Sequence, residues 1–393
     1  MTSTQDTPYF NSKLPHLGTT IFTVMSALAR EQEAINLSQG FPDFDCDPNI
    51  IDLVTHYMKS GANQYAPMSG VLPLREAIAE AAENLYGCIL NPETEITITS
   101  GASESIFNAL ACVIRPGDEV IILEPAYDLY KPVTELFGGQ IVAIPMEVPS
   151  YRVNWDQVEA AITERTRLIM VNTPHNPSGT ILREADMRRL AEIVRNRNIF
   201  VISDEVYEHI VFDQEFHASV LRYPELRERS FAVFSFGKTF HATGWRIGYC
   251  IAPATLSREF RKIHQFNTFA TFTPAQFALA DFMRNADNYL NLRAFFQERR
   301  DKFRALMQET PFQLLECEGT YFQLASYGHL SDEKDQDYCV RLTKEVGVAT
   351  IPLSPFYATE TDHSIIRFCF AKKHETLERA VERLVQYEDR LGR

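Results

Sequence analysis

Between residues 96 and 251 the sequence alternates between short β-branched runs and longer helical stretches. Parallel strands need crossover connections of a dozen or more residues, and helices usually form them. The alternation therefore predicts an α/β fold in which helices flank a mostly parallel central sheet. The expected strands are residues 119–123, 167–172, 200–203, 230–234 and 248–251, and the expected helices are residues 103–114, 127–137 and 184–195.

The chain has 393 residues, more than one hydrophobic core usually organises, so we expect a large and a small domain. After Pro274 the pattern changes to long amphipathic helices, broken near residue 286, and then to shorter strand and helix segments. We predict that residues 49–285 form the large domain and residues 286–393 a smaller α+β domain. Residues 1–48 are expected to form an arm and part of the small domain, although the pattern alone leaves that assignment open.

The formal net charge of −14 disfavours nucleic acid and anionic membrane surfaces as partners. No segment has the length of uninterrupted apolar sequence that a membrane-spanning helix needs, and the N-terminus lacks the pattern of a secretory signal. The seven cysteines are an odd number and include no CxxC pair. These features favour a reducing compartment, and we expect a cytoplasmic protein.

Motifs of several other enzyme classes are absent. There is no GxGxxG dinucleotide fingerprint. Gly237-Lys238-Thr239 resembles the end of a nucleotide-binding phosphate loop, but the required upstream glycine is Ala232. Because neither an HExxH motif nor a histidine pair with ligand spacing occurs, we expect no metal site.

Polar residues follow three of the predicted strands, at the edge where open α/β sheets place their ligand sites. The strand at 167–172 runs into residues 172–179, whose prolines forbid a helix; a rigid turn is the simpler interpretation. Asp204 follows an apolar strand, where a carboxylate needs a partner or caps a helix. Lys238 follows the apolar run 231–234 and is either an ion-paired lysine or an amine with a depressed pKa suited to covalent catalysis.

Seven motifs, taken together and in order, resemble those of the class I aminotransferases, which are pyridoxal 5'-phosphate enzymes of fold type I. They are Ser100-Gly101-Ala102-Ser103, Glu124-Pro125-Ala126-Tyr127, Asn172 to Pro177, Asp204-Glu205-Val206-Tyr207, Ser235 to Thr239, Gly244 to Gly248 and Arg367-Phe368. The resemblance covers nearly the whole chain. Residues 14–22 and 266–272 are similar to the methionine and kynurenine aminotransferases within that family.

The resemblance implies a role for each candidate site residue. Lys238 would anchor the aldehyde of the cofactor and act as general acid and base, while Asp204 would keep a proton on the ring nitrogen. The other implied cofactor-binding residues are Gly101, Ala102, Ser103, Tyr127, Asn176, Tyr207, Ser235, Arg246 and, from a partner subunit, Tyr65. The implied substrate-binding residues are Arg367, Gly40, Asn176 and Phe22.

A guanidinium such as that of Arg367, within the apolar run 365–370, is costly to bury without an anion, although it could instead face solvent. The resemblance makes it the clamp for a substrate carboxylate and implies a homodimer with shared active sites. No cation occurs in residues 265–272, and the phenylalanines of that segment, with Phe22, Tyr65, Tyr127 and Phe356, are candidates for an aromatic pocket wall. We therefore expect methionine as amino donor, with phenylalanine, tyrosine or histidine accepted and a 2-oxo acid as acceptor.

Two other functions stay open at this point. The same lysine and aspartate could serve a carbon–sulphur β-lyase, because that reaction passes through the same carbanion. A non-catalytic regulatory module that binds the cofactor is the other alternative. It is disfavoured because the chain has no helix-turn-helix extension and the wrong net charge for DNA.

Overall fold

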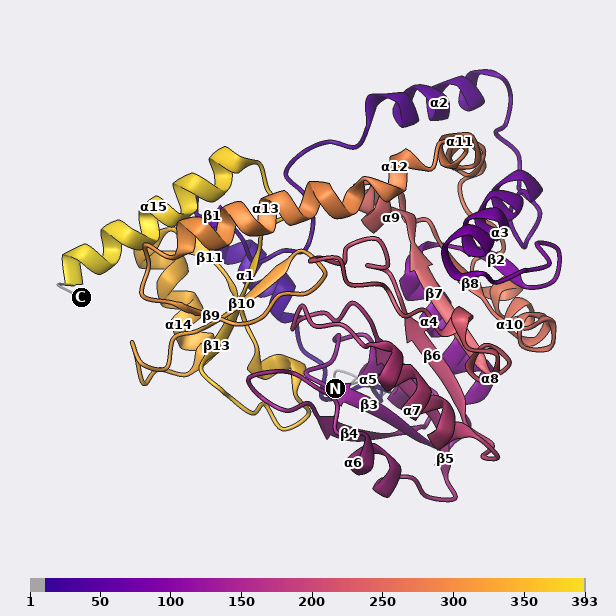
Figure 1. Ribbon diagram of the computed structural model, residues 1–393, viewed down its shortest axis with the longest axis horizontal. Coiled ribbons are helices and arrows are strands. Elements are labelled where there is room, and N and C mark those ends of the chain that lie inside the picture. Colours follow the sequence, from indigo (N-terminus) through magenta and orange to yellow (C-terminus); the bar gives the residue numbers. More distant parts are fainter. Residues whose placement is uncertain (1–10, 392–393) are drawn as a thin grey trace, which may run out of the picture.

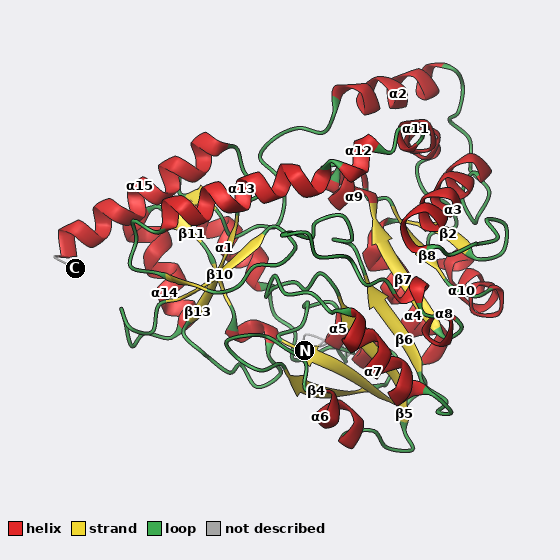
Figure 2. Cartoon of the chain, in the orientation of Figure 1, coloured by secondary structure: helices red, strands yellow, loops and turns green. Residues whose placement is uncertain are grey.

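The computed structural model describes residues 11–391, which form a large central sheet with a smaller sheet beside it (Figures 1 and 2). In spatial order the central strands are β2 (Ile96–Thr99), β8 (Gly248–Ile251), β7 (Ser230–Ser235), β6 (Phe200–Asp204), β5 (Thr166–Asn172), β3 (Glu119–Glu124) and β4 (Gln140–Pro145). Strands β7, β6, β5, β3 and β4 are parallel, and β8 is antiparallel to both of its neighbours. The predicted α/β fold with a mostly parallel sheet is confirmed.

Helices cover both faces of this sheet, because side chains alternate between the faces along each buried strand. In β3, for example, Ile121 packs into one hydrophobic cluster and Ile122 into the opposite one. One face is covered by α3 (Leu72–Tyr86), α6 (Trp155–Ala160), α7 (Glu184–Val194) and α11 (Thr273–Met283), and the other by α4 (Gly101–Val113), α5 (Tyr130–Leu136) and α10 (Ala254–Asn267). Two short helices, α8 (Pro224–Arg227) and α9 (Phe236–Thr239), flank β7, and α2 (Pro48–Lys59) packs on α11.

The smaller sheet is antiparallel and forms a hydrophobic core of its own. Its strands lie in the order β12 (Ile351–Pro352), β13 (Ile365–Cys369), β10 (Phe322–Ser326) and β9 (Gln313–Leu314). Its helices are α14 (Asp335–Arg341), α15 (His374–Leu391) and α13 (Leu292–Met307), which continues from α12 (Asp287–Leu290) and runs beside α15 (Figure 1). Leu37, Phe296 and Phe368 all belong to this second core.

Part of the N-terminal region lies with the C-terminal elements. Strand β1 (Ile35–Asn36) pairs in parallel with β11 (Val348–Ala349), and α1 (Ile21–Glu31) contacts β11 and β12. The first ten residues of the predicted arm lie outside the described residues. The domain boundaries at residues 48 and 285 stay predictions.

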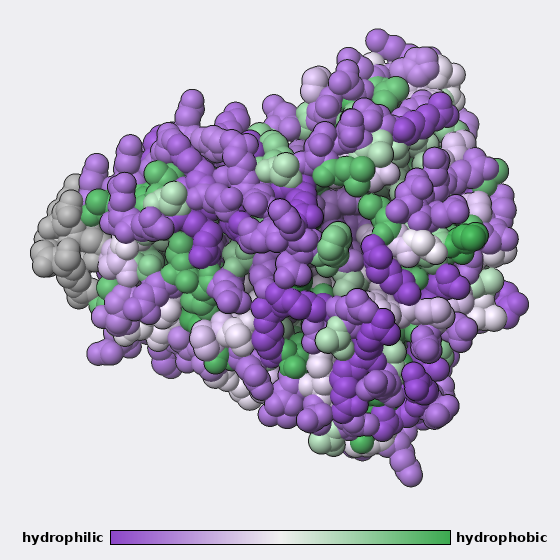
Figure 3. Space-filling model, viewed as in Figure 1, coloured by the Kyte–Doolittle hydropathy of each residue, from purple (hydrophilic) through white to green (hydrophobic). Residues whose placement is uncertain are grey.

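Polar residues cover most of the face seen in Figure 3, and apolar residues appear there in small groups. Among residues 11–391, no helix is long and apolar enough to cross a membrane. Within the same residues, no group of three or more histidine, cysteine, aspartate or glutamate side chains is placed to hold a metal ion.

Candidate functional site

The carboxyl ends of three adjacent parallel strands place polar residues at one edge of the central sheet. In the register of the sheet, Asn172 at the end of β5 lies opposite Asp204 at the end of β6, and Ser235 ends β7 beside them. They line a cavity of about 300 Å³. Its lining includes the predicted Phe22, Gly40, Ala102, Ser103, Tyr127, Asn176, Asp204, Tyr207, Ser235, Lys238, Arg246 and Arg367.

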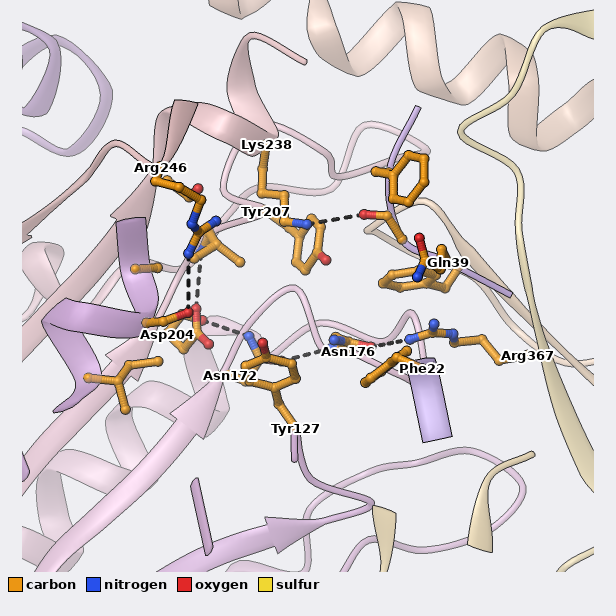
Figure 4. A pocket seen from close by; sticks show the side chains of 18 residues that line it. Phe22, Gln39, Tyr127, Asn172, Asn176, Asp204, Tyr207, Lys238, Arg246 and Arg367 are labelled. Atoms are coloured by element: carbon orange, nitrogen blue, oxygen red, sulfur yellow. Dashed lines mark hydrogen bonds between the residues drawn. The ribbon is translucent and has the colours of Figure 1, made fainter. Parts of the chain in front are cut away.

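Lys238 projects into this cavity from α9, the short helix that follows β7 (Figure 4). Its Nζ donates a hydrogen bond to the carbonyl oxygen of Gly40 at 3.2 Å and lies 2.9 Å from the hydroxyl of Tyr321. Burial lowers the pKa of this amine to about 8. The lysine is therefore an amine that can lose its proton near neutral pH, which is what a base or a nucleophile needs.

Asp204 is the last residue of β6 and is buried. Its carboxylate accepts a hydrogen bond from the Tyr130 hydroxyl at 2.7 Å and a longer one, at 3.4 Å, from the backbone of Val206. Burial raises the pKa of the carboxyl to about 6, because these bonds only partly offset the loss of water. No cationic side chain of residues 11–391 makes a hydrogen bond or ion pair with it, so the carboxylate is available to a positively charged ligand.

The first turn of α4, which also lines the cavity, is suited to hold an anion. The backbone N–H groups of a helix's first turn have no acceptor within the helix, and the helix dipole favours a negative charge there. Arg246 reaches this turn and donates to the Ser103 hydroxyl at 3.4 Å. Gly101 does not line the cavity itself. It has a φ of +72°, and a Cβ on it would lie 2.6 Å from Nη2 of Arg246, so only glycine allows this close approach.

Arg367, on β13, is fully buried, and no carboxylate of residues 11–391 makes a hydrogen bond or ion pair with it. Its Nη1 donates to Asn176 Oδ1 at 2.7 Å and its Nη2 to the Ser38 carbonyl at 2.9 Å. Within the described part of the chain, Nε has no hydrogen-bond partner. A buried guanidinium held only by neutral acceptors calls for an anionic ligand. The alternative that this arginine faces solvent is wrong, since its exposed fraction is 0%.

Aromatic rings enclose the space between these charged groups. Tyr207 is buried, and its ring meets that of Tyr321 edge-on at 5.1 Å between centroids. Tyr127 lines the opposite side, and burial raises the pKa of its hydroxyl to about 12, so it stays protonated. Phe22 packs edge-on against Phe356 at 5.5 Å. The rings thus form a slot for a flat ligand. Asp204 and Arg246 lie toward one end of this slot, and Arg367 lies at the other (Figure 4).

Some predicted residues do not line the cavity in this single chain. Tyr65 is 85% exposed and contacts the ring of Phe269 edge-on. The aromatic side chains Phe266, Phe269 and Phe272, predicted to lie near the pocket, are on the surface. Phe356 does not line the cavity, but its ring centroid is 5.9 Å from the guanidinium of Arg367.

Two residues at the site, Tyr130 and Tyr321, were not singled out from the sequence, and Asn172 was identified only as part of a strand-end motif, without a role of its own. Tyr130 bonds Asp204, Tyr321 contacts Lys238, and Asn172 donates to the backbone oxygen of Asp204 at 2.8 Å. Only Asn172 had a local signal, since it lies at a predicted strand end. The two tyrosines reach the site from parts of the chain where no motif marks them.

Comparison with known proteins gives consistent matches over nearly the whole chain. The family model described as aminotransferase class I and II matches residues 32–384. The methionine aminotransferase of Escherichia coli is 52% identical, over 95% of this chain and 97% of that protein. A probable N-succinyldiaminopimelate aminotransferase of Mycobacterium tuberculosis is 37% identical, over 95% and 97%.

The same likeness appears among solved structures. A crystal structure from Escherichia coli, reported with a methionine aminotransferase function, superposes with a TM-score of 0.95. Its sequence is 51% identical, and the match covers 97% of this chain and all of that one.

Proposed function

The chain belongs to the class I and II aminotransferases, and from that premise we propose that it is a pyridoxal 5'-phosphate enzyme that takes its amino group from methionine and passes it to a 2-oxo acid. The observation that carries the proposal is the arrangement of Lys238, Asp204 and Arg367 around one cavity. The likeness to a methionine aminotransferase supports methionine as the donor. The relatives are aminotransferases, so the β-lyase alternative is not favoured.

The residues of the cavity fit this cofactor. The anion site at α4, with the Ala102 and Ser103 N–H groups, Ser235 and Arg246, matches a phosphate. No cationic side chain of residues 11–391 makes a hydrogen bond or ion pair with the buried Asp204 carboxylate, which therefore matches a protonated ring nitrogen. Tyr127 offers a flat face to the ring, and Tyr207 and Asn176 offer polar groups to its phenolic oxygen.

The chain's own residues then have distinct tasks. When bound, pyridoxal phosphate supplies an aldehyde that accepts the amino group and a ring that stabilises negative charge at the substrate Cα. Lys238 anchors the cofactor and moves the proton at Cα, for which its depressed pKa suits it. Asp204 holds the proton on the ring nitrogen. Arg367, steadied by Asn176 and the Ser38 carbonyl, fixes the substrate carboxylate and thereby orients Cα.

The preference for methionine follows from the charges along the cavity wall. Lys238, Arg246 and Arg367 are the cations in the lining of the described chain, and each already has a task. A distal carboxylate would therefore remain unpaired in a largely buried site, which costs several kcal/mol. The rings of Phe22 and Tyr127 suit a thioether instead, with sulphur–aromatic contacts of about 0.3–1.5 kcal/mol each.

We expect kcat/KM to be highest for methionine in a series with phenylalanine, histidine, glutamate and aspartate as donors. A penalty of a few kcal/mol for the distal charge corresponds to at least about a hundredfold lower value for aspartate. Single-turnover mixing of the loaded enzyme with each amino acid isolates the donor half-reaction from the choice of acceptor. A kcat/KM for aspartate equal to or above that for methionine would refute the proposed aromatic pocket wall. Release of pyruvate from cystathionine without a 2-oxo acid acceptor would identify a lyase.

A homodimer with shared active sites is the second part of the proposal. Tyr65, Phe266 and Phe272 are exposed aromatic residues of the kind that interfaces bury, and Tyr65 would reach the partner's cofactor phosphate. Mixing a Lys238→Ala chain with a Tyr65→Phe chain should then produce heterodimers with one intact site and one doubly damaged site. Activity that stays at the level of the single mutants would show that Tyr65 serves its own subunit.

We place the protein in the cytoplasm. The support is that all seven cysteines lie in the described residues and none forms a disulfide, as is usual in a reducing compartment. Fractionation of cells that express the chain checks this placement.

A further inference from the structure

The amine of Lys238 is held by groups that do not come from the central sheet. Among the described residues its two hydrogen-bond partners are the Gly40 carbonyl, in the loop after β1, and the Tyr321 hydroxyl, directly before β10. The Tyr321 hydroxyl donates to the same carbonyl at 2.6 Å. Because its single hydrogen is used there, its oxygen is left as an acceptor for Nζ. The three polar groups form a closed triangle.

Two aromatic rings that contact each other edge-on lie beside the amine. Nζ lies 5.6 Å from the ring centroid of Tyr207 and 5.6 Å from that of Tyr321. Such rings attract an ammonium more than a neutral amine. Burial raises the pKa of the Tyr321 hydroxyl well above its ordinary value, so the hydroxyl stays neutral beside the lysine.

Tyr321 is itself held firmly in place. Its exposed fraction is 1%, and its ring packs against Phe296 and Phe322 at 5.5 and 4.9 Å between centroids. Gly40 approaches the same rings so closely that a Cβ on it would lie 2.7 Å from Phe322 Cζ and 3.6 Å from Tyr321 Cε2. The hydroxyl and the carbonyl therefore form a rigid bracket for a flexible lysine side chain.

We propose that Tyr321 is a positioning residue for Lys238: with the Gly40 carbonyl, its hydroxyl holds Nζ in the place from which the amine moves the proton at the substrate Cα. The inference rests on the proposed function for the identity of that proton. It adds a residue that neither the motifs nor the tasks assigned above include.

The first test measures the protonation of the lysine without any substrate. The full chain, freed of cofactor and checked for folding, is labelled with cyanate across a pH series, and the modified Lys238 peptide is quantified by mass spectrometry. In Tyr321→Phe the ammonium loses a hydrogen-bond acceptor, so the charged form is less stable and the labelling midpoint should fall by about one pH unit. A change in access alone would alter the rate of labelling but not its midpoint.

Tyr327→Phe is the matched control. Tyr327 is also fully buried and close in sequence, and its hydroxyl donates to the Glu333 carbonyl at 2.8 Å, away from the cavity. This variant loses a comparable hydrogen bond and should keep the labelling midpoint of the parent. An unchanged midpoint in Tyr321→Phe, or an equal shift in both variants, overturns the proposal.

The second test uses the loaded enzyme with methionine. A misplaced amine should lower kcat about tenfold to a hundredfold while KM changes little, because donor binding does not depend on the hydroxyl. Deuterium at the methionine Cα should then slow Tyr321→Phe more than the parent, since proton transfer becomes more nearly rate-limiting. A rise in KM at constant kcat would contradict the proposed role.

The two tests separate this inference from the proposed function. The labelling midpoint involves no amino acid, so a shift found in Tyr321→Phe supports the bracket even if methionine proves to be a poor donor. A good methionine aminotransferase whose Tyr321→Phe variant keeps both midpoint and kcat would retain the proposed function and refute the bracket.

Discussion

Replacing Lys238 by alanine is expected to lower the rate of amino transfer from methionine by on the order of 10²–10⁴-fold or more. The variant loses both the amine that anchors the cofactor and the base that moves the proton at Cα. Borohydride reduction of the loaded parent should fix the cofactor onto the Lys238 peptide, and the same treatment should fix none in Lys238→Ala. An adduct on a different lysine of the parent would refute the assignment.

Lys372→Met serves as the matched control for this experiment. Lys372 is also buried, and its Nζ donates to the Phe41 carbonyl at 2.8 Å, but it does not line the cavity. We expect this variant to retain the borohydride adduct on Lys238 and to lose less than about tenfold in rate, since it removes packing but no reacting group. A loss as large as that of Lys238→Ala would point to general damage rather than to chemistry.

The position of Lys238 illustrates what the sequence makes predictable. A parallel sheet places the carboxyl ends of its strands along one edge, so a polar residue directly after an apolar run falls at that edge whatever the rest of the chain does. Asp204 and Asn172 follow the same rule, and the register places them opposite each other. The local pattern is sufficient for these three residues because each lies on, or within three residues of, the end of its own strand.

Tyr130 and Tyr321 could not be found in this way. Each meets its partner across a long stretch of sequence, Tyr130 at Asp204 and Tyr321 at Lys238. Their positions depend on how α5 and the small sheet pack against the central sheet. That packing is decided by the sum of many apolar contacts, and no single local pattern records it.

One detail of the fold differs from the sequence-based prediction, and a second, the direction of β8, is left open by the predicted mostly parallel sheet. The helix predicted to begin at Tyr127 begins at Tyr130, because the backbone of Ala126 instead donates to the Phe356 carbonyl, which ties this segment to the small sheet. Strand β8 is antiparallel to β7, since residues 236–247 between them form only short helical turns and no long helix that could pack on the sheet as a crossover. The secondary-structure propensities of these segments could reveal neither the contact of Ala126 with the small sheet nor the direction of β8.

Arg367→Met is expected to lower kcat/KM for methionine by on the order of 10²–10³-fold, mainly through a higher KM. The reason is that the guanidinium binds the substrate carboxylate in the ground state and the transition state alike. The kcat/KM of Arg367→Lys should lie between those of the parent and Arg367→Met, because lysine keeps the positive charge but cannot form the bidentate hydrogen bonds of a guanidinium. Steady-state kinetics with methionine measures both variants, and an unchanged KM in Arg367→Met would contradict the assigned task.

The free energy of unfolding of Arg367→Met distinguishes an arginine that binds substrate from one that stabilises the fold. Removing the buried charge relieves a desolvation cost of several kcal/mol, but it also removes the bonds to Asn176 and to the Ser38 carbonyl, worth about 1.5–3 kcal/mol each. The two effects nearly cancel, so the free energy of unfolding should change by less than about 2 kcal/mol. Chemical denaturation of the parent and Arg367→Met measures this difference.

Binding of an unreactive carboxylate such as propionate tests the task of Arg367 without any catalysis. At a concentration a hundred times its Kd, such a ligand should stabilise the parent by about 2.7 kcal/mol, because it binds only the folded state. Arg367→Met lacks the cation that this ligand needs, so its unfolding midpoint should stay where it is when propionate is added. Equal stabilisation of the parent and the variant would show that the carboxylate binds elsewhere, and that Arg367 serves the fold and not the substrate.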